Sequence, residues 1–539
     1  MSSERRFLLF IPLFLGLCAL LGELFGPGVR PVSAAAQESL LGASDGDLKS
    51  SLEAFTKVYD IVEQNYADKL SPDKALYKGA IPGMLRTLDP HSNFLDPEEF
   101  GAMREEQHGM YYGIGMYIGP EPRTGKPMVM YPFGGSPAFK AGLQPGDLIV
   151  EVNGKRVDNL TTTEVADMLK GPKGTKVEVV VSREGVAKPL TFTMIRDEIR
   201  RNSVNAFWLK PGIAYMRIES FTETTGKEVE DDLKKLGEQN IKGLILDLRQ
   251  NPGGLLQQAV SVAGHWLDRG QVVVSHKGRA YAEKPYLARG SQYGENYPIV
   301  VVVDRYSASA AEIVSGALQD HDRAWILGDT TFGKGLVQTV YQLYDNTGLL
   351  LTTQHYYTPS GRLIQRNYSN ISFLDYYYGR RTDNHNTNDV KQTDLGRTVY
   401  GGGGITPDEK YQEPKLDGFQ MNLERKRAFL EFSAYYFANH SKNIPQDWVP
   451  SEQVLDEFHD YLLKQNVAFT EADWARDHAW LRDQLRVQMY ITAFGYDDSQ
   501  KIAIQQDPEI TAALDALPKA AHLLAESKAR FEKQRASLH

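Results

Sequence analysis

Residues 298–320, PIVVVVDRYSASAAEIVSGALQD, indicate the fold more directly than any other stretch of the chain. They open with an aliphatic run, Ile299 to Val303, which is typical of a strand buried on both faces of a parallel sheet. From Ala310 onwards the apolar residues have helical spacing. The turn between strand and helix therefore lies at the carboxyl edge of a sheet, where side chains such as Ser307 and Ser309 become exposed.

The alternation of strand and helix continues on both sides of this stretch, from about residue 205 to about residue 410. Buried-strand runs occur at 212–218 and 243–249, and helical spacing occurs at 228–236 and 255–267. Such alternation predicts an α/β layer in which the strands are mainly parallel.

A chain of 539 residues is too long for one hydrophobic core, so several domains are expected. We predict an α/β multidomain protein: a helical region at 40–104, a domain of short strands at 105–198, the α/β core at 199–412 and a helical region at 413–539. Residues 366–398 are polar and rich in tyrosine, which favours a surface insertion.

The N-terminal 36 residues have the layout of a secretory signal peptide. Arg5 and Arg6 precede an apolar run, and small residues follow at 33–36. Because the apolar region reaches Phe25, a single uncleaved membrane anchor is the alternative. We therefore expect a periplasmic or other extracytoplasmic protein, secreted or anchored to the inner membrane. Cys18, the only cysteine, lies inside this segment, so no disulfide is expected.

Composition excludes several classes of function. The net charge of -9 gives no reason to expect a nucleic-acid partner. The sequence contains no HExxH motif and no cluster of cysteine and histidine, so we expect neither a metal nor another cofactor.

Residues 328–335, GDTTFGKG, contain most of a phosphate-binding loop. The required Ser or Thr after the lysine is replaced by Gly335, and two strand-like runs follow where a helix is needed. A nucleotide site is therefore disfavoured, and Lys334 needs another role.

Ser309 has two interpretations when its spacing alone is considered. With Glu312 three residues later it matches a capping box, which is the favoured interpretation because such caps are common. A serine at the edge of a sheet can also be a nucleophile, provided that a base removes its proton.

Several segments together resemble the carboxyl-terminal processing peptidases, which are tail-specific serine proteases. YSASAAEI at 306–313 and TFGKGLVQ at 331–338 resemble the active-site segments of that family. The resemblance extends to LDLRQNPGG, YTPSGRLIQ and GGGGITPD, in the family's order, and covers about residues 48–411. It implies a crotonase/ClpP-like α/β core with Ser309 as nucleophile, Lys334 as general base and Gln338 orienting the lysine.

Ser-Lys pairs are a known variant of the serine protease arrangement. A lysine that acts as base near neutrality needs its pKa lowered by about three units, which burial must supply. The oxyanion of the intermediate needs backbone N–H donors, for which Ala310 and the turn at Gly253 and Gly254 are the candidates.

The region at 110–195 resembles a PDZ domain in two segments, YYGIGMYI at 111–118 and GSPAFKAGLQPGDLIVEVNG at 135–154. The resemblance implies that consecutive N–H groups bind the terminal carboxylate of a peptide, which adds a strand to the sheet edge. These groups belong to Gly113, Ile114, Gly115 and Met116. Arg183 is a candidate sensor that reports docking to the active site.

We therefore expect a serine endopeptidase that captures free C-termini of extracytoplasmic proteins and processes or degrades them. Two alternatives stay open: a noncatalytic PDZ scaffold, and a Ser-His peptidase that uses His265, His321 or His355. The helical ends favour self-association, the N-terminal segment favours membrane association, and the C-terminal extension leaves adaptor binding open.

Overall fold

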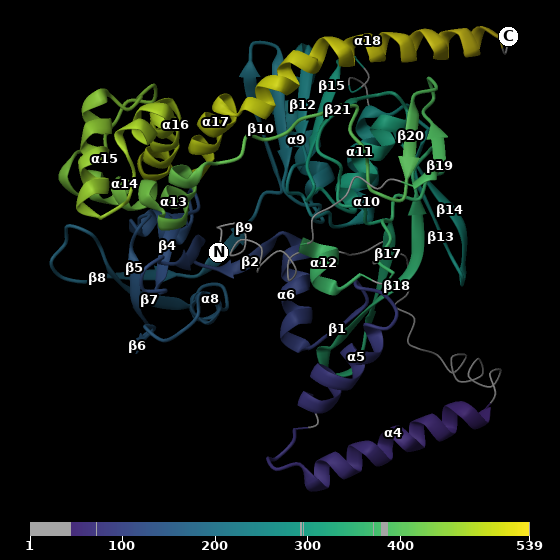
Figure 1. Cartoon of the computed structure of the whole chain (residues 1–539), viewed down its shortest axis with the longest axis horizontal. Helices are drawn as coiled ribbons and strands as arrows, with labels where there is room; N and C mark the ends of the chain where they lie inside the picture. Colours follow the sequence, from purple (N-terminus) through teal and green to yellow (C-terminus); the bar gives the residue numbers. More distant parts are fainter. Residues whose placement is uncertain are drawn as a thin grey trace.

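The computed structural model describes residues 45–71, 73–290, 294, 296–369, 371–378 and 386–537. In chain order these residues form an N-terminal helical region, a small sheet domain, a larger α/β domain and a set of C-terminal helices (Figure 1). The expected multidomain α/β fold is confirmed. The expected leader at 1–36 lies outside the described residues. Within the described ranges, no helix has both the length and the apolar character needed to span a bilayer.

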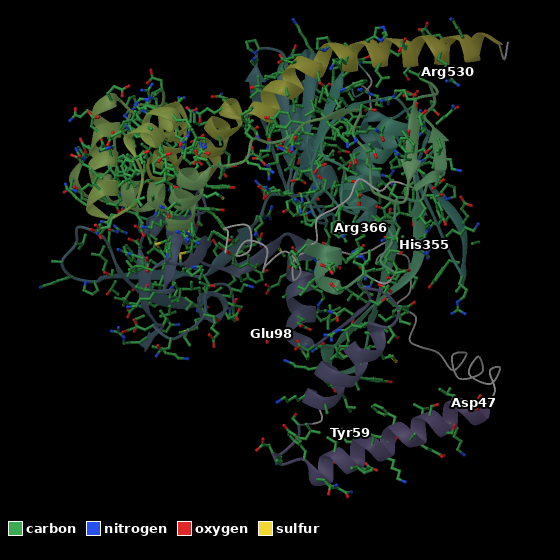
Figure 2. All side chains as sticks on the ribbon, viewed as in Figure 1. Asp47, Tyr59, Glu98, His355, Arg366 and Arg530 are labelled. Atoms are coloured by element: carbon green, nitrogen blue, oxygen red, sulfur yellow. The ribbon has the colours of Figure 1, made fainter. Side chains whose placement is uncertain are left out.

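The N-terminal region consists of short helices and one long helix. Its elements are α4 (Asp45–Asn65), the π-helix η2 (Asp73–Ala80), α5 (Ile81–Leu85), β1 (Asn93–Leu95) and α6 (Pro97–His108). The α4 helix stands apart from the body of the protein, and its side chains, including those of Asp47 and Tyr59, project around it (Figure 2). Its apolar stripe of Leu52, Phe55, Val58, Ile61 and Val62 is 40–60% exposed. Helical spacing therefore predicted the helix correctly but did not specify a partner for its apolar face.

The small sheet domain spans residues 110–200. Its strands are β2 (Met110–Gly113), β3 (Met116–Pro120), β4 (Pro127–Pro132), β5 (Leu148–Val152), β6 (Lys155–Arg156), β7 (Lys176–Ser182), β8 (Leu190–Ile195) and β9 (Asp197–Arg200). The main sheet has the order β3-β4-β5-β7-β8, so β3 is an edge strand. The two helices are α7 (Pro137–Ala141) and α8 (Thr162–Leu169), the latter starting at a Thr161–Glu164 capping box.

The α/β domain is built on a six-stranded sheet with the order β10-β11-β12-β15-β16-β21. Its strands are β10 (Val204–Lys210), β11 (Ile213–Ile218), β12 (Gly243–Asp247), β15 (Ile299–Val303), β16 (Trp325–Gly328) and β21 (Glu409–Lys410). From β11 to β21 every pairing is parallel, as the alternating pattern predicted. The accompanying helical elements are α9 (Thr225–Leu236), η3 (Glu238–Asn240), α10 (Leu256–Trp266) and α11 (Ala310–Asp320).

A second, antiparallel sheet completes this domain, with the order β1-β18-β13-β14 and with β17 paired to β18. Its strands from this domain are β13 (Val272–Gly278), β14 (Tyr281–Leu287), β17 (Leu336–Gln342) and β18 (Gly348–Tyr357), with η4 (Tyr344–Asn346) in the hairpin. The predicted hairpin after Lys334 is thus confirmed. Beyond it lie α12 (Phe373–Tyr378) and the pair β19 (Asn386–Gln392) and β20 (Thr398–Gly401).

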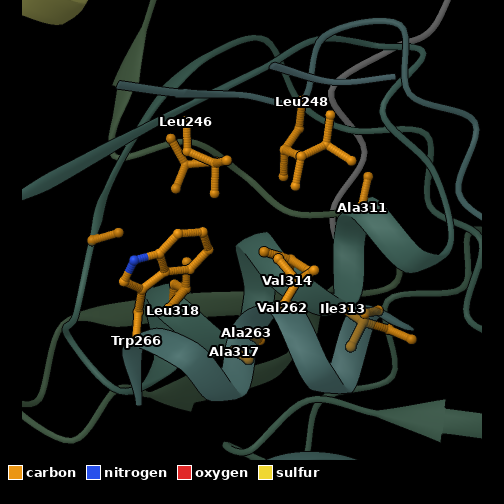
Figure 3. Close-up of a cluster of buried hydrophobic side chains, with 14 of the residues drawn as sticks. Leu246, Leu248, Val262, Ala263, Trp266, Ala311, Ile313, Val314, Ala317 and Leu318 are labelled. Atoms are coloured by element: carbon orange, nitrogen blue, oxygen red, sulfur yellow. The ribbon is translucent and has the colours of Figure 1, made fainter. Parts of the chain in front are cut away.

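Alternate residues of the central strands face opposite layers of the α/β domain. Leu246 and Val301 pack against α10 and α11, where Trp266 is directed toward Leu246 and Leu318 (Figure 3). Ile245 and Val300 instead pack against the last helix, α18 (Pro508–Ser537). Both faces of the sheet are therefore buried, which accounts for the unbroken aliphatic run in β15.

The remaining C-terminal helices form a separate aromatic cluster that lies against the small sheet domain. They are α13 (Gly418–Lys426), α14 (Ala428–Asn439), α15 (Glu452–Lys464), α16 (Glu471–Phe494) and α17 (Tyr496–Gln506). Tyr496 stacks on Tyr131 of β4 with ring centroids 4.2 Å apart, and a side chain at Gly185 would touch Ala438. The C-terminal helices therefore contact both the small sheet domain and the α/β core.

Candidate active site

Ser309 lies where β15 turns into α11, in a backbone conformation that is rare for a residue with a side chain. Its φ is 52° and its ψ is -111°. The preceding turn is held by Asp304, which accepts the N–H groups of Tyr306 and Ser307 at 2.9 Å. Strained conformations of this kind cluster at functional sites because the surrounding structure must enforce them.

Lys334 lies in the loop between β16 and β17, and its side chain is buried. Only 2% of the residue is exposed, and Nζ donates to Oε1 of Gln338 at 3.1 Å. Gln338 is buried as well, and its amide nitrogen donates to the carbonyl oxygen of His91 at 2.6 Å. A neutral amide in a buried setting does not supply the negative charge that would favour an ammonium, so burial favours the uncharged amine.

Glu312 joins the serine loop to the lysine loop. Its fully buried carboxylate accepts the backbone N–H groups of Ser309 and Lys334, each at 2.8 Å, and that of Gly333 at 2.6 Å. The Thr331 hydroxyl is a fourth donor. Burial raises the pKa of Glu312, although these hydrogen bonds oppose the shift. A single carboxylate thus fixes the backbone of both segments.

The capping box predicted at Ser309 is present, although the Ser309 hydroxyl makes no hydrogen bond of normal geometry to the first turn of α11. A second link comes from Tyr356 of β18, whose hydroxyl lies 3.1 Å from the carbonyl oxygen of Ser309 and also contacts that of Lys334. The backbone at Ser309 is therefore held from two sides, by Glu312 and by Tyr356.

Gly253 and Ala310, two of the three proposed oxyanion residues, lie beside Ser309. A side chain on Gly253 would lie 2.7 Å from Ser309 Cβ and 2.9 Å from the Ala310 nitrogen, so only glycine fits there. The N–H of Gly253 donates to Asn251 Oδ1 at 2.8 Å. In the described part of the chain, no hydrogen bond is found for the N–H of Ala310 or Gly254.

The four residues proposed to bind a terminal carboxylate form the connection from β2 to β3. Its carbonyl groups face inward, since those of Ile114 and Gly115 accept hydrogen bonds from Ala138 and Ser136 at 2.8 Å and 2.7 Å. Gly115 has a φ of 73°, and a side chain there would lie 2.5 Å from Ser136 Cβ. The loop therefore leads directly into the free edge of β3.

Comparison with known proteins adds three family models that match in the order of the domains. They are Peptidase family S41 over residues 212–371, a PDZ domain over 134–183 and the activating protease CtpB N-terminal domain over 31–99.

Curated relatives are named after C-terminal processing. The carboxy-terminal-processing protease of Bartonella bacilliformis is 38% identical over 332 residues, which are 61% of this chain and 76% of the relative. CtpA of Bacillus subtilis is 36% identical over 332 residues, covering 61% and 70%. The relative from Synechocystis is 39% identical over 292 residues, covering 53% and 68%.

This chain belongs to peptidase family S41, the carboxy-terminal processing proteases. It is therefore a serine-type peptidase, and its small sheet domain is a PDZ domain. The resemblance inferred from short motifs is confirmed.

Arg183, the candidate sensor of this S41 protease, binds within the PDZ domain. Its guanidinium donates to both carboxylate oxygens of Asp147 at 2.7 Å and to the carbonyl of Gly142 at 2.8 Å. Among the described residues, no hydrogen bond or ion pair joins it to Ser309 or Lys334.

The three histidines of the Ser-His alternative have other partners or positions. His265 binds Glu238 at 2.8 Å, His321 binds Asp394 at 2.7 Å, and His355 lies on β18 with Nδ1 buried and unpaired. No hydrogen bond between any of them and Ser309 occurs in the described ranges.

The histidine that lies at the site is His91, which was not among the candidate residues. Its ring is buried between the hydroxyl groups of Tyr376 and Tyr377, each 3.0 Å away. Burial, with the nearby charge of Arg366, holds the pKa of His91 well below its usual value. The expectation of a surface insertion is wrong for α12, because Tyr376 and Tyr377 are only 3% and 5% exposed.

Glu312 was recognised from the sequence only as a cap, and Asn251 only as part of a turn. The capping match was a usable signal for the bond to Ser309, but the bonds to Gly333 and Lys334 depend on tertiary contacts. Across the described residues, no group of three or more His, Cys, Asp or Glu side chains is arranged to hold a metal.

Proposed function

We propose that this protease cleaves proteins captured by their C-termini, using Ser309 as nucleophile and Lys334 as general base. The observation that carries this proposal is the shared carboxylate of Glu312, which fixes the backbone of both residues at 2.8 Å. Burial of the Lys334 amine against a neutral amide supports its action as a base.

In the first step, Ser309 Oγ bonds to the carbonyl carbon of the scissile amide, and its proton passes to Lys334 Nζ. The carbonyl oxygen becomes an oxyanion, which the N–H groups of Ala310 and Gly254 stabilise. Breakage of the C–N bond returns the proton from Lys334 to the leaving amine. Water then hydrolyses the acyl-enzyme, with Lys334 again accepting a proton.

Gln338 keeps the amine in place through this cycle. Its side chain accepts from Lys334 and donates to the His91 carbonyl, so its orientation is fixed at both ends. Because an amide carries no charge, it orients the amine without stabilising the ammonium as a carboxylate would.

Substrate capture is assigned to the PDZ domain. The free edge of β3 can accept a peptide strand, and the connection from Gly113 to Met116 can bind the terminal carboxylate. We propose extracytoplasmic substrates because residues 1–36 have the layout of a signal peptide or anchor.

The exposed stripe on α4 supports self-association as the use of the N-terminal end. Contiguous exposed apolar surface of this kind is typical of an interaction site. We propose a second copy of the chain as its partner, and the C-terminal helices leave room for an adaptor protein.

The experiment compares the wild-type enzyme with Ser309→Ala, Lys334→Ala and His355→Ala on an unfolded protein, with products mapped by mass spectrometry. Loss of cleavage in the first two, with binding of the substrate tail retained, is the expected result. Ser315→Ala is a matched control, since it removes another buried hydroxyl from α11.

Two outcomes would replace the proposal by its alternatives. Cleavage that persists in Lys334→Ala and is lost in His355→Ala would favour a Ser-His peptidase. Tail binding without any cleavage by the wild-type protein would favour a scaffold. Amidation of the substrate C-terminus is expected to raise KM if the terminal carboxylate is what the PDZ domain binds.

A further inference from the structure

The α12 helix packs on the catalytic loops. Tyr376 and Tyr377 form a buried cluster with Ala308, which precedes the nucleophile, and with Phe332, which lies two residues before Lys334. Arg366 lies 4.0 Å from the ring centres of both Phe332 and Tyr376, and its position between β18 and α12 can be followed in Figure 2. The α12 helix is thus in contact with both loops of the proposed dyad.

The two tyrosine hydroxyls hold the His91 ring at opposite nitrogens. Tyr376 Oη lies 3.0 Å from Nε2 and accepts from the Gln365 amide, while Tyr377 Oη lies 3.0 Å from Nδ1 and donates to the Pro90 carbonyl. These roles leave Tyr376 as donor to Nε2 and Nδ1–H as donor to Tyr377, which assigns the proton of a neutral imidazole. Every proton in this chain of hydrogen bonds then has an acceptor.

The backbone carbonyl of His91 links these hydrogen bonds to Gln338 and, through it, to Lys334. This carbonyl accepts from Gln338, whose other end accepts from Lys334. The opposite side of the same turn is fixed by Asp89, which accepts the N–H groups of His91 and Ser92 at 2.8 Å and 2.7 Å. Among the described contacts that hold this turn, those made by Tyr376 and Tyr377 come from α12.

We propose that Tyr376 and Tyr377 are positioning residues for the reaction: by clamping the His91 ring they fix its carbonyl, and through it Gln338 and Lys334. The proposal rests on the Ser-Lys mechanism proposed above. It gives the tyrosine-rich insertion a role in setting the geometry of the general base.

The test replaces each hydroxyl singly, with Tyr376→Phe and Tyr377→Phe. Tyr378→Phe is the matched control, because it lies in the same helix and its hydroxyl is buried without a hydrogen bond in the described structure. We expect kcat to fall about fivefold in each of the first two variants, with KM unchanged, and no change in the control.

The pH profile of kcat/KM supplies a readout that a loss of stability would not move. The charged groups around His91 and Lys334 are Arg366, Glu312 and Asp89, and none of them is altered by these substitutions. A looser amine gains hydration, so the acid limb of the profile should move to higher pH in Tyr377→Phe and stay in place in Tyr378→Phe.

A double-variant cycle tests the route through His91. His91→Phe keeps an aromatic ring but removes its hydrogen bonds, so Tyr377→Phe should have no further effect on kcat in that background. Additive losses in the cycle, or equal profiles for Tyr377→Phe and Tyr378→Phe, would overturn the positioning role.

Lys334→Ala separates the two proposals. An active Lys334→Ala variant refutes the mechanism itself, whereas additive losses beside an inactive Lys334→Ala variant refute the positioning role alone.

Discussion

The PDZ domain and the protease core fill their interiors with different side chains. The PDZ cluster is largely aliphatic, with Val129, Ile149, Val177 and Val179 almost fully buried. The protease core also buries charged groups beside its aliphatic residues, both at the catalytic loops and at the far end of α11. They include Asp247, Glu312, Asp320, Lys334 and Arg362.

Burial of a charged group is unfavourable unless hydrogen bonds or an opposite charge compensate it. In the protease core the compensation is extensive, as the donors around Glu312 and the ion pair of Arg362 with Asp320 show. The PDZ interior is mainly apolar, although the domain also buries the Asp147 carboxylate beside Arg183, whereas in the core a buried carboxylate fixes the catalytic loops. Substitutions in the two regions should differ in kind.

The largest effect is expected for Glu312→Ala in the core. Loss of the carboxylate leaves buried N–H groups of Ser309, Gly333 and Lys334 without a partner, so unfolding free energy should fall by about 3–5 kcal/mol. Because both loops lose their common anchor, kcat/KM should fall at least about 100-fold. Urea unfolding and peptide cleavage measure the two effects. Activity close to that of the wild type would contradict the anchoring role, and Glu312→Gln is the volume-matched control.

Ile149→Ala probes the aliphatic interior of the PDZ domain. Removing this buried side chain should cost about 2–5 kcal/mol, mostly as a local loss of stability. Amide hydrogen exchange should accelerate in β5 and β7 but not in β12 and β15. Equal acceleration in all four strands would show that the two regions unfold as one unit.

The contact between α18 and the core should depend on pH. Glu509 lies 2.8 Å from Arg249, yet burial raises the pKa of its carboxyl to about 7, since Arg249 is already paired with Asp247. The unfolded chain releases this proton near the ordinary value of 4.5. The contribution to stability is therefore complete below that value and is lost as pH rises through about 7, by an amount of about 3 kcal/mol.

Glu509→Gln should remove this pH dependence. Its unfolding free energy, measured by urea titration between pH 4.5 and 8, should decline less than that of the wild type. If the unfolding free energies of the two proteins declined equally with pH, Glu509 would lack the raised pKa on which this prediction rests.

The smallest effect on folding is expected on α4, which belongs to neither interior. Val58→Ser changes a side chain that is 60% exposed, so unfolding free energy should change by no more than about 0.5 kcal/mol. Light scattering should nevertheless show weaker self-association. An unchanged mass at all concentrations would argue against the stripe as a contact between copies.

The sequence carried the catalytic prediction because Ser309, Lys334 and Gln338 lie in short, recognisable segments. The mainly parallel central sheet followed from the alternation of strand and helix. The role of His91 could not be predicted, because its carbonyl meets Gln338 across 247 residues and through a backbone atom, which leaves no pattern in side-chain types. The tyrosines of α12 were misjudged because polar neighbours surround them in the chain, although the fold buries their rings.

The link from His91 to Gln338 also bears on when the enzyme becomes active. A ribosome must finish Gln338 before the amide can meet a carbonyl made 247 residues earlier, and it must pass Tyr377 before the imidazole is clamped. A growing chain therefore cannot assemble the proposed centre until all of these segments have been made.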